Sequence, residues 1–238
     1  MKVITNEAIV AKRKKWANIL APIAMLLLLG GLGTNLLSLR SEQIDPLYFY
    51  ATLLLLLLGF IASTVSSSLV NRWVREPRAD QILGKTLRGF DNRHILFNYT
   101  TPFPHVLVAQ NKVYAIITRP QKGHIRVTNT KWKRDFSLSR VLRFFADESL
   151  GNPTIEAQLN AGKLAKYLQQ ALPEETEVPI EPVILFTHPE VQLTVNGSDV
   201  TAMKAGNFKA YLRKSTRGAA LGAQLRQQLT QILSNRPA

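Results

Sequence analysis

Two long apolar runs lie close together in the first third of the chain. Residues 16–37 carry no formal charge, and residues 47–70 include the consecutive leucines Leu53–Leu58. An α-helix rises about 1.5 Å per residue, so each run reaches the roughly 30 Å needed to cross the hydrocarbon core of a bilayer. The sequence therefore predicts transmembrane helices at 16–37 and 47–70, joined by a short external loop at 38–46.

A cleaved signal peptide is the alternative for the first run, because the basic stretch Lys12–Lys15 precedes it. The apolar core of a signal peptide is shorter than this run, and no clean small-x-small cleavage site follows. An uncleaved membrane span is therefore the preferred interpretation.

The bases that flank the two runs predict their orientation. They gather before the first run and after the second, and a single base lies between the runs. These bases are Lys2, Lys12, Arg13, Lys14, Lys15, Arg40, Arg72, Arg75 and Arg78. Flanks rich in Lys and Arg stay in the cytosol. We therefore expect residues 1–15 to form a basic cytosolic tail, both chain ends to be cytosolic, and the location to be a bacterial plasma membrane.

Cysteine is absent, and the formal net charge is +14. The lack of cysteine excludes disulfides, thiol catalysis and thiolate zinc sites. A strong excess of base indicates an anionic partner, either nucleic acid or the acidic headgroups of a bilayer. Because the apolar runs predict insertion into a bilayer, lipid accounts for part of this charge. The sequence indicates no particular protein partner.

Residues 76–214 are expected to form an α/β domain whose mixed sheet is flanked by helices. Helices are predicted at 77–87, 152–172 and 203–213, and residues 215–238 are expected to hold a C-terminal amphipathic helix over 221–233. Strands are predicted at 94–99, 106–108, 113–118, 124–128, 183–186 and 191–195.

Two of these elements carry more specific predictions. The near-continuous apolar run at 113–118 indicates a central strand that is covered on both faces, and the alternation at 191–195 indicates an edge strand. In the helix at 152–172, the expected core positions are Ile155, Leu159, Leu164 and Leu168.

Four features follow one another in the soluble part. An opening helix precedes the strand pair PHVLVAQNKVYAIITRPQKGHI, Trp132 comes a short way on, Asn152–Pro153 begins a helix, and PVILFTHPEVQLTV is followed by another helix. In this order, residues 79–213 resemble the nuclease-related domain, a branch of the restriction-endonuclease-like superfamily. The resemblance implies a restriction-endonuclease-like domain.

The resemblance also implies which residues would carry catalysis. Active members have an Asp-His string and then Glu-x-Lys and Gly, in which two carboxylates hold a divalent cation and the lysine activates water. Here His105 and Gly123 match, but Pro104, Ile117 and Arg119 stand at the Asp, Glu and Lys positions. Proline and isoleucine cannot bind a metal ion, and arginine does not lose its proton. The resemblance therefore implies a catalytically degenerate domain without metal or cofactor.

The expected function is a membrane-tethered, non-catalytic interaction or scaffold protein, and two alternatives remain open. One is an active metal-dependent nuclease with displaced carboxylates. Its candidate residues are Asp80, His105, Arg119, Asp135 and Glu156. The other is a membrane-attached module that binds nucleic acid.

A basic segment between residues 112 and 143 provides the candidate anion-binding residues, with Asp135 as its one acid. Its bases are Lys112, Arg119, Lys122, Arg126, Lys131, Lys133, Arg134, Arg140 and Arg143. The interleaved aromatic residues are Trp132, Phe136, Phe144 and Phe145. Such a segment can follow a phosphate backbone while its aromatics stack on bases, or it can lie against anionic lipid. The third interpretation is a solvated face whose aromatics belong to the core.

Overall fold

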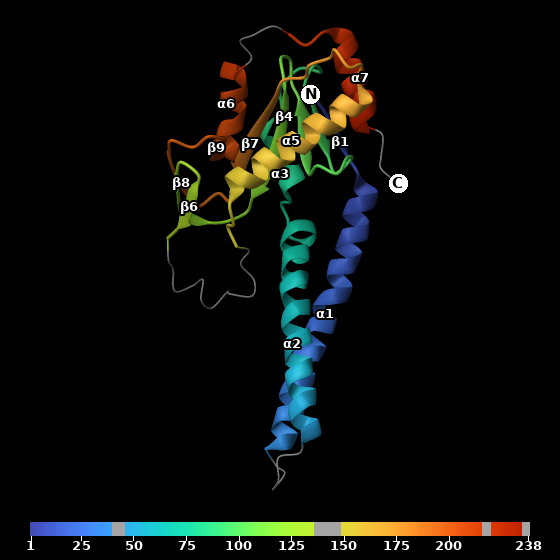
Figure 1. Ribbon diagram of the computed structural model, residues 1–238, viewed down its shortest axis with the longest axis vertical. Coiled ribbons are helices and arrows are strands. Elements are labelled where there is room, and N and C mark those ends of the chain that lie inside the picture. The colour runs from blue at the N-terminus through green and yellow to red at the C-terminus, as the bar shows by residue number, and fades with distance from the viewer. Residues whose placement is uncertain (40–45, 136–148, 216–219, 235–238) are drawn as a thin grey trace. The chain divides into compact units, whose positions relative to one another are not determined.

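The computed structural model describes residues 1–39, 46–135, 149–215 and 220–234 (Figure 1). The chain divides into two compact units. The globular unit comprises Met1–Glu7, Ala79–Phe136 and Ser149–Ala238. The hairpin unit contains Ala8–Arg78, which carries the two long apolar helices.

The hairpin consists of α1 (Glu7–Ser38) and α2 (Pro46–Leu69), and a short π-helical segment, η1 (Val70–Val74), follows α2. Helix α1 begins well before the apolar run, so the expected tail at residues 1–15 is not a tail. The second half of that expected tail is helical because alanine, lysine, arginine and glutamate all favour a helix.

Small residues repeat every seven positions along the facing sides of the two helices. The buried residues are Val10, Ala17, Ala24 and Gly31 in α1, and Thr52, Gly59 and Ser66 in α2. A seven-residue period keeps one stripe of each helix against its partner, and small side chains let the two backbones approach closely. The hairpin is therefore held by small-residue packing.

Two glycines mark the points of closest approach in the hairpin. A Cβ atom on Gly31 would lie 2.8 Å from the Leu56 side chain and 3.2 Å from the Leu56 backbone nitrogen. A Cβ atom on Gly59 would lie 2.8 Å from the Leu28 side chain and 3.0 Å from the Leu28 backbone nitrogen. These distances leave no room for a side chain at either position.

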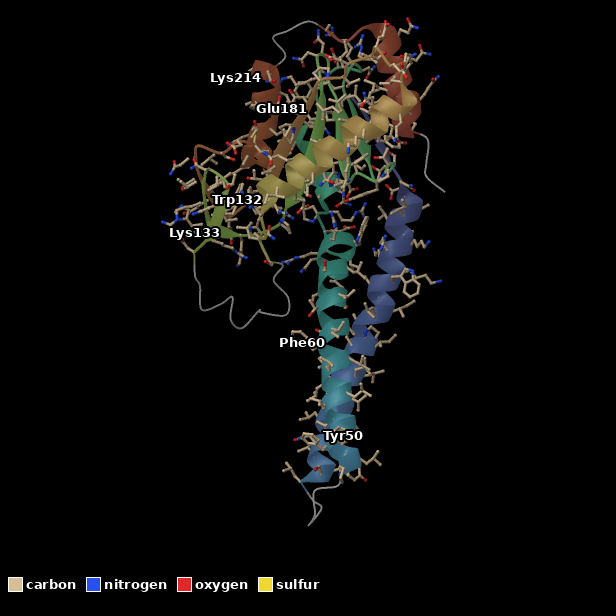
Figure 2. All side chains as sticks on the ribbon, viewed as in Figure 1. Tyr50, Phe60, Trp132, Lys133, Glu181 and Lys214 are labelled. Atoms are coloured by element: carbon tan, nitrogen blue, oxygen red, sulfur yellow. The ribbon has the colours of Figure 1, made fainter. Side chains whose placement is uncertain are left out.

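The large apolar side chains of the hairpin point mostly outward, as Tyr50 and Phe60 do in Figure 2. Leu26 is 66% exposed and Leu53 is 58% exposed. The prediction of two helices long and apolar enough to cross a membrane is confirmed. Outward-facing leucines around a core of small residues suit lipid as the surrounding solvent.

The globular unit contains two sheets. The larger sheet has the strand order β1-β2-β3-β4-β7-β9, and the smaller has the order β6-β5-β8. Strands β2, β3 and β4 are antiparallel neighbours, whereas β1 pairs in parallel with β2, and β7 pairs in parallel with both β4 and β9. The strands are β1 (Lys2–Thr5), β2 (Ile95–Asn98), β3 (His105–Val108), β4 (Val113–Arg119), β5 (Gly123–Thr128), β6 (Lys131–Arg134), β7 (Ile180–Phe186), β8 (Val191–Asn196) and β9 (Thr201–Lys204).

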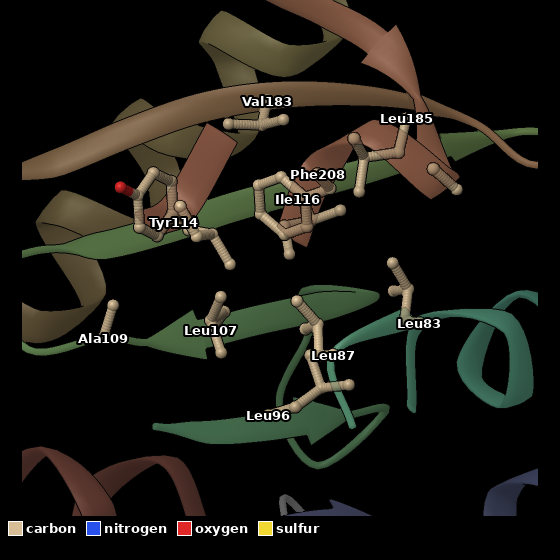
Figure 3. Packing of buried hydrophobic residues seen from close by; sticks show 12 residues of the cluster. Leu83, Leu87, Leu96, Leu107, Ala109, Tyr114, Ile116, Val183, Leu185 and Phe208 are labelled. Atoms are coloured by element: carbon tan, nitrogen blue, oxygen red, sulfur yellow. The ribbon is translucent and has the colours of Figure 1, made fainter. Parts of the chain in front are cut away.

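Helices cover both faces of the larger sheet. On one face, α3 (Ala79–Thr86) and α6 (Ala205–Ser215) form a core with Leu107, Tyr114 and Ile116 (Figure 3). On the other face, α5 (Pro153–Ala171) and α7 (Ala223–Ser234) pack against the alternate strand residues Val106, Val113 and Ala115. The predicted α/β class with a mixed sheet flanked by helices is confirmed, and β4 is the fully covered central strand.

Three short strands lie outside the sequence prediction. They are β1, β6 and β9, each of which is four residues long. Strand β9 occupies the start of the helix expected at 203–213, so α6 begins at Ala205 instead. The edge position predicted for 191–195 is confirmed, because β8 ends the order β6-β5-β8.

The expected core of α5 is half wrong. Leu164 and Leu168 are buried, but Ile155 is 51% exposed and Leu159 is 57% exposed. In the N-terminal half of α5, Ala157 packs against the sheet instead. The face of the helix that meets the sheet therefore includes Ala157, and Ile155 and Leu159 lie off it.

The C-terminal helix α7 belongs to the globular unit. Its residues Leu229 and Leu233 are fully buried in the core beside α5. The domain expected at 76–214 therefore extends in both directions, to include α7 at one end of the chain and β1 at the other.

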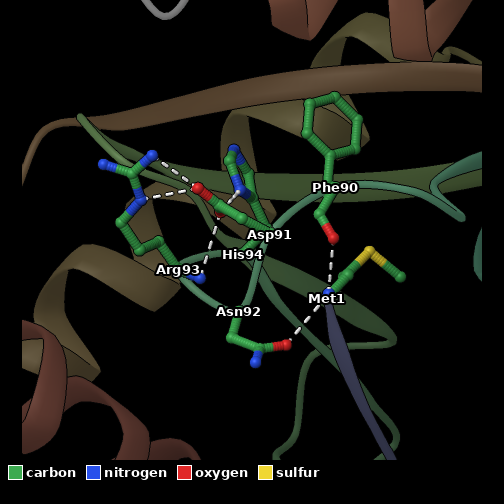
Figure 4. A network of polar contacts seen from close by, with 6 residues as sticks. All are labelled: Met1, Phe90, Asp91, Asn92, Arg93 and His94. Atoms are coloured by element: carbon green, nitrogen blue, oxygen red, sulfur yellow. Dashed lines mark hydrogen bonds and ion pairs between the residues drawn. The ribbon is translucent and has the colours of Figure 1, made fainter.

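A polar network lies where β1 enters the sheet (Figure 4). The Met1 α-amino group donates hydrogen bonds to the Phe90 carbonyl oxygen at 2.6 Å and to Asn92 Oδ1 at 3.3 Å. Asp91 accepts from Arg93 and from His94 Nδ1 at 2.8 Å. Partial burial opposes the effect, but these hydrogen bonds lower the pKa of the Asp91 carboxyl to about 2. The turn that precedes β2 is thereby ordered next to β1.

Candidate functional site

The positions that the resemblance assigns to a metal site hold an ion pair instead. Ile117 lies in the middle of β4, is 2% exposed, and packs in the apolar core. Arg119 ends β4, and its guanidinium group forms an ion pair with Glu156 of α5. The Arg119 side chain is only 14% exposed. Among the residues that the structure describes, the carboxylate paired with Arg119 at this end of β4 is therefore already bound to a cationic side chain.

The candidate residues of an active nuclease fall on opposite faces of the larger sheet. Asp80 lies on the buried side of α3, one turn before Leu83, and His105 shares its face of β3 with Leu107. Arg119 follows the opposite alternation of β4 and contacts Glu156 of α5. Within the described part of the chain, no group of three or more His, Asp or Glu residues could hold a metal ion.

His105 belongs to a buried polar row that crosses three strands. The register aligns Thr5, Asn98 and His105 on β1, β2 and β3. His105 Nδ1 donates to Asn98 Oδ1 at 2.8 Å, and Asn98 Nδ2 donates to Thr5 Oγ1 at 3.1 Å. Asn98 is 0% exposed and His105 is 2% exposed. Buried polar groups need such partners. The hydrogen bond to Asn98 therefore gives His105 a structural role in the sheet.

The bases of the basic segment lie in separate parts of the structure. Lys112 lies at the opposite end of β4 from Arg119, where its Nζ is 2.9 Å from Glu181 Oε2. Lys122 lies 4.0 Å from Glu190, and the Arg134 Nε donates to the Lys122 carbonyl oxygen at 2.8 Å. Arg140, Arg143, Phe136, Phe144 and Phe145 lie outside the described residues. The described bases therefore do not form one continuous patch.

Three of the bases share the outer face of the smaller sheet, hereafter the basic sheet face. The register places Arg126 of β5 beside Lys133 of β6, and Thr128 beside Lys131. Arg126, Lys131 and Lys133 are all exposed. Figure 2 shows Lys133 at the edge of the molecule. This face can contact an anion with cationic side chains from two strands.

Asp135 offsets part of the charge of the basic sheet face. Its carboxylate lies 2.9 Å from His124 Nδ1 and also forms an ion pair with Arg126. The hydrogen bond from His124, together with that from Arg126, lowers the pKa of the Asp135 carboxyl. His124 Nε2 is 3.0 Å from Thr194 Oγ1. These contacts leave Lys131 and Lys133 as the main cationic groups of the face.

Trp132 points to the inner side of the smaller sheet. Its indole Nε1 donates to Thr154 Oγ1 at 2.8 Å, and its ring centroid lies 5.8 Å from that of Phe186. It packs against the core that contains Ile125 and Val191. The basic sheet face therefore has no stacking contribution from Trp132. In the string KWKR (131–134), Trp132 alternates with Lys131 and Lys133, and this alternation alone indicates that Trp132 faces the opposite side of a strand from these two bases.

Comparison of the chain with protein-family models, with curated proteins and with solved structures found no match.

Proposed function

We propose that this chain is a two-span membrane protein that holds a non-catalytic interaction domain at the cytosolic face of a bacterial plasma membrane. The outward-facing apolar side chains of α1 and α2 support insertion into a bilayer. The bases that precede the first apolar run and follow the second support the orientation. The nuclease-related ancestry of the domain is part of the same proposal, supported by the order of its helices and strands.

The ion pair between Arg119 and Glu156 is the observation that carries the non-catalytic part. Metal-dependent hydrolysis of a phosphodiester needs carboxylates that hold the cation against the scissile phosphate. Beside Arg119, the Glu156 carboxylate is neutralised by a guanidinium group that stays protonated. Asp80 lies on the other face of the sheet, so it cannot hold a cation together with Glu156. A contact surface for a protein partner is therefore the function that we propose for the domain.

We expect the full-length chain, purified in detergent, to cleave no plasmid DNA in the presence of Mg²⁺ or Mn²⁺. The measurement is the loss of supercoiled plasmid over time on an agarose gel. The matched control is the double variant Asp80→Asn/Glu156→Gln, purified in the same way, because contaminating nuclease would act equally in both samples. Metal-dependent cleavage by the unaltered chain that disappears in the double variant would contradict the proposal.

The orientation can be tested with single cysteines, because the chain has none of its own. We expect Ser41→Cys, between the two spans, to react with a membrane-impermeant maleimide in intact cells. Glu190→Cys, on an exposed side chain of the globular unit, should react only after the membrane is permeabilised. The reverse pattern would show that the domain faces outward.

Binding of nucleic acid through the basic sheet face has weaker support. The face presents few cations, and Trp132 is turned away from it. Single-strand binding normally combines a basic groove with exposed aromatic side chains.

A further inference from the structure

The packing contacts of the hairpin determine which residues of α1 and α2 lie at the same level. Gly31 lies opposite Leu56, and Leu28 lies opposite Gly59. Each step toward the N-terminus of α1 is therefore a step toward the C-terminus of α2. Continuing this register brings Lys15 toward the level of Arg72 in η1, and Arg75 follows η1 directly.

This register brings the basic flanks of both helices to the same end of the hairpin. We call them the basic collar, which consists of Lys12, Arg13, Lys14, Lys15, Arg72 and Arg75. All six side chains are exposed. Among the described residues from 7 to 78, the acids are Glu7 and Glu76, and Glu76 forms an ion pair with Arg78 at 3.9 Å. The collar therefore concentrates positive charge that the hairpin itself does not neutralise.

Lipid-facing apolar side chains begin directly beside the basic collar. Trp16 is 57% exposed and Ile19 is 41% exposed on α1, and Val65 is 47% exposed on α2. The same surface thus offers cations at one level and apolar contacts at the next. A phospholipid matches both, because its phosphate is joined to acyl chains. A soluble anion has no acyl chain to match the exposed aliphatic side chains of Ile19 and Val65.

We propose that the basic collar is a binding site for anionic phospholipids, in which its lysine and arginine side chains contact the headgroup phosphates of one leaflet. The site rests on the proposed membrane insertion and deepens it by naming a lipid class. Lysine and arginine near an anionic membrane surface each favour binding. Loss of three collar bases should therefore weaken the preference for anionic over zwitterionic lipid by at least about tenfold.

The test uses the full chain in a mild detergent, titrated with phosphatidylglycerol or with phosphatidylcholine of the same acyl chains. Native mass spectrometry measures the fraction of chains that retain lipid. The collar variant is Lys15→Gln/Arg72→Gln/Arg75→Gln. The matched control removes the same charge elsewhere, in Arg126→Gln/Lys131→Gln/Lys133→Gln. We expect the unaltered chain and the control to prefer phosphatidylglycerol, and the collar variant to lose that preference.

Two results would overturn the collar site. One is equal binding of the two lipids by the unaltered chain. The other is retention of the preference in the collar variant, which, together with its loss in the control variant, would move lipid binding to the basic sheet face. Alkaline carbonate extraction of cell membranes checks insertion separately. Release of the unaltered chain into the soluble fraction would overturn the proposed function itself, whereas retention restricts any failure to the collar.

Discussion

Replacing Gly59 with valine should open the hairpin of α1 and α2. A Cβ atom at this position would lie 3.0 Å from the backbone nitrogen of Leu28, which cannot move without shifting α1. Overpacking of a close contact costs about 1–3 kcal/mol, so the equilibrium constant for closing the hairpin should fall by a factor of roughly 5 to 160. The Gly31 contact with Leu56 should make Gly31→Val equally disruptive.

The closed hairpin can be measured by cross-linking in this cysteine-free chain. Thr34 Oγ1 and Thr52 Oγ1 lie 2.8 Å apart, so cysteines at these two positions should form a disulfide rapidly on mild oxidation. We expect Gly59→Val to slow that reaction. Gly33→Val is the matched control, because a Cβ atom at Gly33 would meet nothing within 4 Å. Equal cross-linking rates in the two variants would refute the close approach at Gly59.

Two leucines of α5 should respond very differently to the same substitution. Leu164 is 0% exposed and packs in the core beneath α5 and α7. Its replacement by alanine should lower the free energy of unfolding by about 2–5 kcal/mol, through lost burial and the cavity left behind. Leu159 is 57% exposed, so Leu159→Ala should change the stability by less than about 0.5 kcal/mol.

The comparison requires the full chain, because β1 supplies an edge strand of the larger sheet. Urea unfolding in detergent, followed by Trp132 fluorescence in a background with Trp16→Phe and Trp73→Phe, measures the globular unit. Both variants replace a leucine of α5 with alanine, so they differ only in which position of the helix is changed. A loss of stability in Leu159→Ala as large as that in Leu164→Ala would show that α5 meets the sheet through a different face.

Several features could be predicted from short stretches of sequence. The two long apolar helices follow from uncharged apolar runs, and the covered strand β4 follows from its continuous apolar string. The start of α5 is equally local, since Pro153 occupies its first turn and the Asn152 side chain accepts from the Ile155 backbone N–H at 3.3 Å. Each of these signals lies within a few residues of the structure that it specifies.

The arrangement of the candidate site required the tertiary structure. Asp80 and Glu156 looked equally available in the sequence, yet α3 and α5 pack on opposite faces of the sheet. Arg119 and Glu156 are far apart in the chain, but the crossing of α5 over β4 brings them into an ion pair. Whether two charges meet depends on helix placement, which no local pattern encodes.

For the hairpin too, some features follow from the local sequence and others only from the tertiary structure. The apolar runs and their basic flanks determined that two helices form, where they lie and which ends carry charge. The tertiary structure decided that Gly31 packs against Leu56 and that Gly59 packs against Leu28. Helix formation depends on neighbours within a few residues, because the backbone hydrogen bonds are local. The register between two helices depends instead on how the side chains of one helix pack between those of the other. The same sequence pattern is compatible with more than one such packing.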